Sequence, residues 1–207
     1  MKYSANADIY TDAESGVLKN RYHLRDAQEL ARVESGLFAL RAAELALHPI
    51  AGRFDLAHLQ AIHSHLFGDI YDWAGAVRSV DISKGTTRFA HHAHIARQAW
   101  MLAHALHAEN NLQDTGIGQF CRRAAHYLGE WNVLHPFREG NGRSMREMFS
   151  LLAHACGYHI NWHQIAPDAF LEAMIQAYHG DESLLAGLLR ANTMPRDEAR
   201  ALLHARP

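Results

Sequence analysis

The stretch His135–Arg146 reads H-P-F-R-E-G-N-G-R-S-M-R and gathers several chemically reactive side chains around a pair of glycines. Gly140-Asn141-Gly142 stands where a loop is expected to become a helix, because His135-Pro136 interrupts the helical pattern before it. Backbone N–H groups at such a helix start converge on one point, at the positive end of the helix dipole. The stretch therefore predicts an anion site that suits phosphate.

The remaining side chains of this stretch fit a polyphosphate. Arg143 and Arg146 are three residues apart on one helical face, and two guanidinium groups at an anion site indicate more than one phosphate. Glu139 is placed to hold Mg²⁺ beside bound phosphates, and His135 can take up a proton near neutral pH. Phe137 is expected to anchor the loop in the core. Each feature alone also fits a turn, a solvated helix face or a capped histidine, and their joint occurrence favours a functional site.

Outside this stretch the apolar residues recur mainly at helical spacing. The expected helices run from the N-cap Asp26 to His48-Pro49, from Phe54 to Gly68, from His94 to Asn110-Asn111, over 118–133, over 142–156 with Gly157 after it, over 169–177 and over 183–190. Residues 80–89 differ, because Val80 and Ile82 alternate with polar neighbours before the turn Gly85-Thr86, which predicts a short hairpin. The expected fold class is all-α with one small β-hairpin, the only β signal in the chain.

Composition limits the classes of function. The chain has 207 residues, with 20 Lys plus Arg against 22 Asp plus Glu, and this balance argues against direct nucleic-acid binding. The amino-terminal residues show no apolar signal segment, and no apolar run approaches the length of a membrane span. Cys121 and Cys156 are too few for a disulfide framework. We therefore expect a cytoplasmic protein with no membrane partner.

The stretch resembles the H-x-F-x-D/E-G-N-G-R-x-x-R motif of the Fic family of nucleotidyltransferases, and every fixed position is matched. The resemblance covers roughly residues 10–190 and includes L-K-N at Leu18–Asn20, the helix through Glu34 and Arg41, Y-D-W-A-G-x-x-R at Tyr71–Arg78 and I-S-K-G at Ile82–Gly85. It implies a Fic-like helical bundle whose hairpin is a flap. The implied division is an extended arm over 1–25, a catalytic domain over 26–192, and a tail or short helix over 193–207.

The resemblance also implies transfer of AMP from ATP to a Tyr, Ser or Thr hydroxyl of a target protein. The implied roles are general base for His135, Mg²⁺ ligand for Glu139, phosphate cradle for Gly140, Asn141 and Gly142, β-phosphate contact for Arg143 and γ-phosphate contact for Arg146. Doc-like kinases, a related class, carry Lys where this chain has Gly142, so glycine favours AMP transfer over phosphorylation.

The flap is expected to align an extended segment of the target by strand addition. Its residues are Val80, Asp81, Ile82, Ser83, Lys84, Gly85 and Thr86.

Many Fic proteins are held inactive by a helix with the pattern S/T-x-x-x-E-G/N, which this chain does not contain. The nearest matches start at Ser4 and Thr193, and their fourth neighbours are Asp8 and Asp197. We therefore expect a toxin whose brake is a separate small antitoxin that carries the pattern. The resemblance suggests bacterial type II topoisomerase subunits, of gyrase or topoisomerase IV, as targets.

Other interpretations remain open at this point. A Fic-fold protein could transfer UMP or phosphate, a nucleotide-binding adaptor could lack catalysis, and a metal hydrolase would be a different enzyme. The 17 histidines include His91-His92-x-His94 and His104-x-x-His107, whose spacings suit a transition metal. No H-E-x-x-H or C-x-x-C pattern accompanies them, so compositional bias is the simpler explanation.

Overall fold

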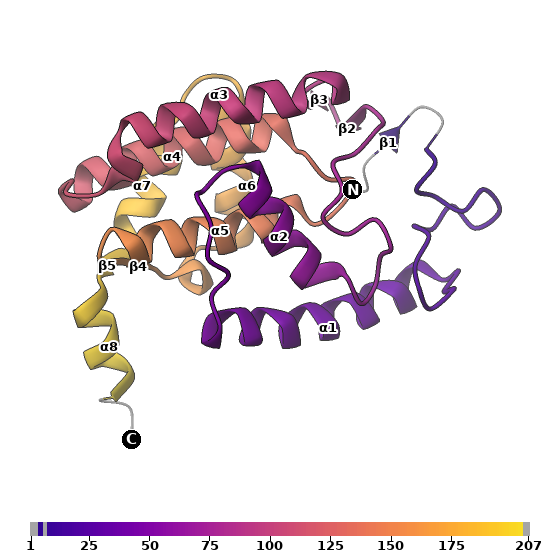
Figure 1. The fold of residues 1–207 in the computed structure, drawn as a ribbon, viewed down its shortest axis with the longest axis horizontal. Helices are drawn as coiled ribbons and strands as arrows, with labels where there is room; N and C mark the ends of the chain where they lie inside the picture. The colour runs from indigo at the N-terminus through magenta and orange to yellow at the C-terminus, as the bar shows by residue number, and fades with distance from the viewer. Residues whose placement is uncertain (1–3, 6–7, 205–207) are drawn as a thin grey trace. The chain divides into compact units, whose positions relative to one another are not determined.

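The structure is a computed structural model that describes residues 4–5 and 8–204. Most of these residues are helical (Figure 1), which confirms the predicted all-α class. The α-helices are α1 (Ala27–Leu47), α2 (Leu56–Phe67), α3 (Ile95–Ala108), α4 (Ile117–Leu134), α5 (Asn141–Ala155), α6 (Pro167–Tyr178), α7 (Ser183–Ala191) and α8 (Arg196–His204).

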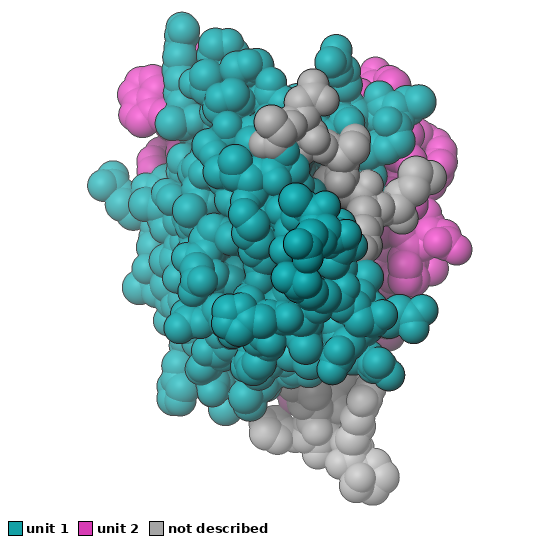
Figure 2. Space-filling model, turned by 90° about the vertical axis from the view of Figure 1, so that its right-hand side faces the viewer, with its two compact units in different colours: residues 1–99, 134–147 teal, residues 100–133, 148–207 magenta. Residues whose placement is uncertain are grey.

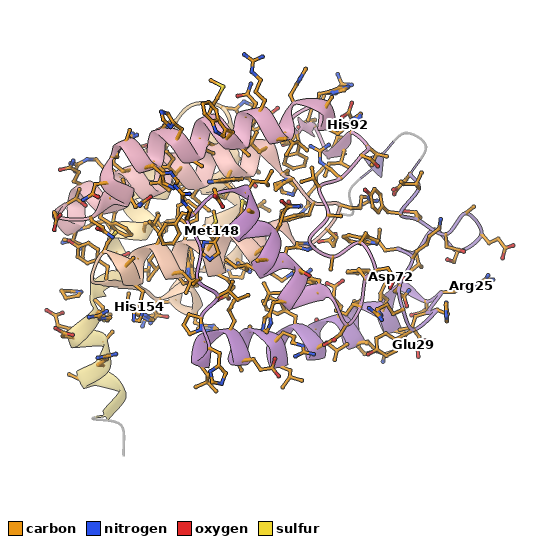
Figure 3. The ribbon with its side chains drawn as sticks, viewed as in Figure 1. Arg25, Glu29, Asp72, His92, Met148 and His154 are labelled. Carbon is orange, nitrogen blue, oxygen red and sulfur yellow. The ribbon has the colours of Figure 1, made fainter. Side chains whose placement is uncertain are left out.

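Local sequence signals define where the first helices begin. The Asp26 side chain caps α1 by accepting from the backbone N–H groups of Gln28 and Glu29. Glu29, labelled in Figure 3, also places a negative charge in the first turn, where it complements the helix dipole. The Asp55 carboxylate caps α2 in the same way, through the N–H of His58. These helix starts agree with the sequence because capping depends on neighbours only two or three residues away.

The predicted hairpin is present as β2 (Ile82–Lys84) and β3 (Thr87–Arg88), which pair antiparallel around a turn where Gly85 has φ +59°. The expectation that it is the only β structure was wrong. β1 (Ser4–Ala5) pairs with the other edge of β2, and β4 (Tyr158–Ile160) pairs with β5 (Thr193–Pro195). Strands of two or three residues are too short to show an alternation of apolar and polar side chains in the sequence. The pairing of these strands therefore depends on tertiary contacts.

The chain divides into two compact units, coloured separately in Figure 2. Unit 1 comprises residues 1–99 and 134–147, and unit 2 comprises residues 100–133 and 148–207. The whole stretch from His135 to Arg146 belongs to unit 1. The predicted arm, catalytic domain and tail have other boundaries and stay a prediction, although residues 196–204 form the helix α8.

Unit 2 is organised around packed helices and the small β4–β5 pair. α6 packs on α7, and α8 contacts both strands of the pair.

Cys121 and Cys156 both have free thiols, and burial raises the pKa of the Cys156 thiol to about 11. Within the part of the chain that the structure describes, no helix is both long and apolar enough to cross a membrane.

In unit 1, helix α2 packs against the motif loop, residues 135–140. Leu59, Ile62, Leu66 and Phe67 of α2 are buried, and so is Phe137 of the loop. The ring of His63 contacts both Phe67 of α2 and Phe137 of the loop, and its centroid is 3.9 Å from that of Phe137. Its Nδ1 accepts the Gly75 N–H at 2.9 Å, and its Nε2 donates to the Glu139 carbonyl at 2.9 Å. A neutral His63 therefore joins α2 to the loop.

Arg78 joins the motif loop to the base of the hairpin. Its buried guanidinium donates from Nε to the His135 carbonyl at 2.8 Å, from Nη1 to the Val80 carbonyl at 2.6 Å, and from Nη2 to the Leu134 carbonyl at 3.2 Å and to the Ala90 carbonyl. The backbone N–H of Arg78 donates to the Pro136 carbonyl at 2.9 Å. Burial lowers the Arg78 pKa to about 10, so the side chain is still charged at neutral pH.

Replacing this guanidinium by an ammonium tests its structural role. Lysine keeps the charge, but its donors converge on one nitrogen and cannot reach carbonyls in three segments. We expect Arg78→Lys to lower the free energy of unfolding by about 2–4 kcal/mol, since several charge-assisted hydrogen bonds are lost. Urea titration measures this loss, with the exposed Arg32→Lys as control. Equal stability of the two variants would contradict the role.

His63 gives the fold a defined pH dependence. Burial lowers its pKa from 6.5 to about 4, so the unfolded chain binds a proton on this residue more readily than the folded chain does. The stabilisation is present above pH 6.5 and is lost as the pH falls toward 4, by up to about 3 kcal/mol. His63→Gln keeps a donor for the Glu139 carbonyl and should remove this part of the pH dependence. An unchanged difference in unfolding free energy between pH 7 and pH 4 would disprove the assignment.

Candidate active site

The motif loop is held closed by the side chain of Asn141, the first residue of α5. Its Oδ1 accepts the Phe137 N–H at 2.8 Å, and its Nδ2 donates to the Phe137 carbonyl at 2.7 Å. The side chain is 1% exposed. Asn141 was predicted to cradle phosphate. The structure uses its amide group within the loop, so only its backbone N–H can contribute to an anion site.

The two glycines beside Asn141 differ in what the fold requires of them. Gly140 has φ +81°, and a Cβ there would lie 2.6 Å from Cε2 of Phe67 and 3.1 Å from Nε2 of His63. Its backbone and its packing therefore both need glycine. Gly142 has no such constraint, because its φ is not positive and a Cβ would meet no atom within 4 Å. Its lack of a side chain leaves open space over the first turn of α5.

Arg143 is fixed by a carboxylate and two aromatic rings. Its Nη2 is 2.6 Å from Oε1 of Glu34 in α1, and its guanidinium carbon lies 4.6 Å from the ring centroid of Phe67 and 5.2 Å from that of Phe38. The other oxygen of Glu34 accepts from the Tyr71 hydroxyl. Burial, reinforced by the charge of Glu34, raises the Tyr71 pKa, so this hydroxyl keeps its proton. One side of the guanidinium is thereby held in place.

Arg146 lies one turn further along α5 and is half-buried. Burial lowers its pKa, and the like charge of Arg143 lowers it further, whereas Glu147 opposes the shift. The two arginines therefore lie on the same side of the helix and repel one another. A bound polyanion would relieve this repulsion more effectively than a single negative charge.

Glu139 is suited to the predicted Mg²⁺. Its Oε1 accepts the Gly140 N–H at 3.0 Å and lies 3.7 Å from Nη2 of Arg143. This contact directs the carboxylate toward the start of α5, and the side chain is 30% exposed. A hard oxygen donor next to an anion site is what Mg²⁺ prefers when it bridges phosphates. The residues present therefore fit the ion, with Oε2 as the oxygen that would bind it.

His135 is placed by the hairpin as well as by its own loop. It is 4% exposed, its carbonyl accepts from Arg78, and its ring stacks on Phe89 with a centroid distance of 3.8 Å. Its φ is +45°, a left-handed conformation that is unusual outside glycine and is often found at functional positions. Phe89 follows β3 directly, and its N–H donates to the Ile82 carbonyl at 3.3 Å. The hairpin thus positions the ring of the predicted base.

The predicted target-docking residues fall at different places in the hairpin. Ile82, Ser83 and Lys84 form β2, Gly85 and Thr86 form the turn, and Val80 and Asp81 precede β2. Ile82 is 3% exposed, so its side chain serves the core. In the described residues β2 lies between β1 and β3, and Ser4–Ala5 occupy the edge at which an added strand was expected.

The sequence interpretation assigned no role to four residues that position the site. Phe89, Arg78 and Glu34 contact predicted site residues directly. Arg138, a variable position of the motif, binds Asp8 at 2.6 Å and connects the loop to the amino-terminal residues. The block Tyr71–Arg78 and the helix through Glu34 had been noted for their resemblance, which was the available signal for two of the four.

The comparisons with known proteins agree with this geometry. The Fic/DOC family model matches residues 53–153. The chain is 43% identical over 191 residues to the protein adenylyltransferase VbhT of Bartonella schoenbuchensis, an alignment that covers 92% of this chain and 40% of VbhT. It is 39% identical over 189 residues to the Fic protein of Salmonella typhimurium, described as a probable protein adenylyltransferase, covering 91% of this chain and 94% of that protein.

A solved structure shares the fold. The BepC effector protein of Bartonella tribocorum, crystallised with bound AMPPNP, superposes with a TM-score of 0.84 at 26% identity, over 90% of this chain and 97% of that one. Fold, motif and overall sequence lead to the same assignment. The chain belongs to the Fic/DOC family and groups with its protein adenylyltransferases.

Proposed function

We propose that the chain transfers AMP from ATP to a Tyr, Ser or Thr hydroxyl of a target protein. The observation that carries the proposal is the start of α5, where the space over Gly142 and the cations Arg143 and Arg146 adjoin one helix terminus. A triphosphate matches two guanidinium groups and a row of backbone N–H donors. The relatives named protein adenylyltransferases support the same reaction.

In the proposed reaction the target hydroxyl attacks the α-phosphorus of ATP. Its proton passes to the His135 ring, the new P–O bond forms, and the bond to the β-phosphate breaks to release pyrophosphate. Arg143 and Arg146 bind the β- and γ-phosphates, so the α-phosphorus is held in a fixed orientation. Phe89 limits the motion of the His135 ring, and Glu34 limits that of Arg143.

Glu139 is proposed to hold Mg²⁺, and Asn141 and Gly142 to offer their backbone N–H groups to the phosphates, while Gly140, whose N–H donates to Glu139, forms the turn of the phosphate cradle. When bound, the metal would neutralise part of the triphosphate charge. Glu139 contributes its carboxylate from a position already oriented by the Gly140 N–H.

We further propose that the chain acts as a toxin in the cytoplasm and that a separate antitoxin, carrying the S/T-x-x-x-E-G/N helix, restrains it. The absence of that pattern from the sequence supports this proposal. Subunits of gyrase and topoisomerase IV are the proposed targets. An extended target segment would pair with β2 in the place of Ser4–Ala5, since that edge accepts an antiparallel strand.

The two glycines of the motif provide a matched test of the phosphate site. Gly142→Ala should leave thermal stability unchanged or higher, because the new methyl group meets no atom and alanine favours helices. It should weaken ATP binding by about tenfold, since the methyl group occupies the space proposed for the phosphates. Gly140→Ala should instead destabilise the fold by about 1–3 kcal/mol through its positive φ. Calorimetry of ATP binding and thermal melts measure both, and full ATP affinity in Gly142→Ala would contradict the proposal.

Replacing the proposed base tests the chemistry. His135→Asn is preferable to alanine because asparagine tolerates the φ of +45°. We expect transfer to fall by about 10²–10⁴-fold while ATP binding persists. The assay incubates lysate with ATP labelled at the α- or the γ-phosphate. Protein labelled only from the α position supports AMP transfer, and label only from the γ position indicates a kinase.

His104→Asn, an exposed histidine of unit 2, is the control for this substitution. It should retain full activity. Growth arrest on expression of the chain alone, lost in His135→Asn and kept in His104→Asn, would support the toxin proposal. Transfer that survives in His135→Asn would place the base on another residue.

A further inference from the structure

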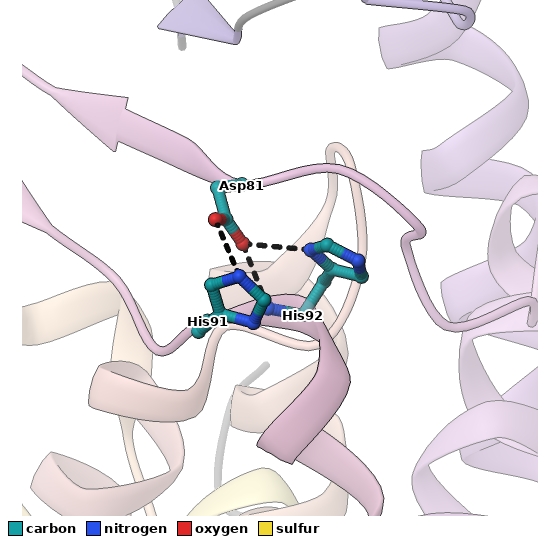
Figure 4. Close-up of side chains that lie close together, drawn as sticks. All are labelled: Asp81, His91 and His92. Carbon is teal, nitrogen blue, oxygen red and sulfur yellow. Dashed lines mark hydrogen bonds and ion pairs between the residues drawn. The ribbon is translucent and has the colours of Figure 1, made fainter.

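One cluster of potential metal ligands lies outside the proposed reaction. Asp81, His91 and His92 place one ligand atom each within 4.8 Å of one another (Figure 4). His91 and His92 belong to the His91-His92-x-His94 pattern, for which the proposed catalytic function has no use. Asp81 directly precedes β2, and His91 follows β3 by two intervening residues. The cluster therefore joins the two ends of the hairpin.

We propose that Asp81, His91 and His92 bind a divalent transition-metal ion such as Zn²⁺, which closes the base of the flap. Two imidazole nitrogens and one carboxylate oxygen form a donor set typical of zinc, with a remaining position for water. Mg²⁺ is excluded as the preferred ion, because it favours oxygen ligands. The proposal is independent of the AMP-transfer reaction.

The distances suit an ion with little rearrangement. Oδ2 of Asp81 is 3.2 Å from Nε2 of His91, and Oδ1 is 2.9 Å from Nδ1 of His92. Tetrahedral zinc with bonds of about 2.0–2.1 Å separates its ligand atoms by about 3.3 Å. The two imidazole rings are stacked with their centroids 4.5 Å apart, and Nε2 of His91 and Nδ1 of His92 both face the carboxylate of Asp81 (Figure 4). The side chains of Asp81 and His91 are about half exposed, so an ion can enter from solvent.

The existing hydrogen bonds allow each imidazole to bind a metal by shifting its ring proton. Oδ1 of Asp81 also accepts the backbone N–H of His92 at 2.8 Å, which leaves Oδ2 as the ligand. When the metal binds at Nε2 of His91 and at Nδ1 of His92, the proton of each ring moves to the opposite ring nitrogen, so neither ring has to release a proton. For His91 this breaks a long 3.3 Å contact, in which Nδ1 accepts the Ala93 N–H.

Neighbouring charges limit the affinity without blocking the site. Nη1 of Arg78 lies 3.8 Å from Oδ1 of Asp81. The Arg78 guanidinium is buried and its donors are directed to backbone carbonyls, on the Oδ1 side of the carboxylate. His94 contacts His91 at a ring distance of 5.5 Å but is not part of the cluster.

A metal at this position would act on the flap. It would link Asp81 to His91, two residues after Phe89, which stacks on the ring of His135. Separation of Asp81 from His91 would then require loss of the ion, because a ligand that binds only the arrangement in which these residues are adjacent stabilises that arrangement. We therefore expect the bound ion to protect the flap from proteolysis at Lys84 and Arg88, the trypsin sites within it.

The first test is calorimetric titration of the untagged full chain with Zn²⁺ after chelator treatment, in excess Mg²⁺. We expect one equivalent to bind, and expect Asp81→Asn, His91→Gln and His92→Gln each to weaken binding by about tenfold or more. Asp81→Asn retains an oxygen for the His92 N–H, so its fold should persist, as a thermal melt would verify. The control His104→Gln changes the other histidine pair and should bind Zn²⁺ as the unmodified chain does.

The second test measures trypsin cleavage after Lys84 and Arg88 with and without Zn²⁺. Zinc should slow cleavage several-fold in the unmodified chain and in His104→Gln, and should have no effect in Asp81→Asn. The proposal is overturned if no zinc binds, if the three ligand variants bind it as the unmodified chain does, or if His104→Gln abolishes binding.

Discussion

The geometry of the site depends on the hydrogen bonds that the buried guanidinium of Arg78 donates to backbone carbonyls. The guanidinium satisfies carbonyl groups of the motif loop, at Leu134 and His135, and of the hairpin base, at Val80 and Ala90. The loop includes a left-handed histidine, and its buried carbonyl groups need hydrogen-bond donors. A single side chain with several donors in a rigid plane provides them, and it does so from a position between both segments. The hairpin and the proposed base are therefore parts of one structural assembly.

The second constraint is the close packing below the loop. Gly140 lies against Phe67 and His63. The neutral His63 donates a hydrogen bond to the carbonyl of Glu139, the residue that precedes Gly140. These contacts fix where α5 begins. Because the loop is anchored from below, the outward side of Gly142 can remain open, and the N–H groups of the first turn can serve an anion. The fold thus holds one motif glycine rigidly and leaves space at the other.

Charge is arranged around α5 with a similar division of roles. Glu34, supported by the Tyr71 hydroxyl, neutralises part of Arg143 and holds it between aromatic rings. Arg146 has a like-charged neighbour and a lowered pKa. One cation is therefore oriented before any nucleotide arrives, and the other adds positive charge on the same face. Such an arrangement favours a ligand with several negative charges over a single carboxylate.

The sequence by itself determined the helical class, the cap at Asp26, a short hairpin within residues 80–89 and the motif from His135 to Arg146. These features depend on local spacing, on capping within three residues or on a contiguous pattern of side chains. Tertiary structure alone decided that Arg78 bonds to the motif loop, that Glu34 pairs with Arg143, and that Phe89 stacks on His135. It also decided the β1–β2 and β4–β5 pairs and the meeting of Asp81 with His91 and His92. All of these contacts join separate segments of the chain, and their partners are chosen by how those segments pack in three dimensions, which no local pattern records.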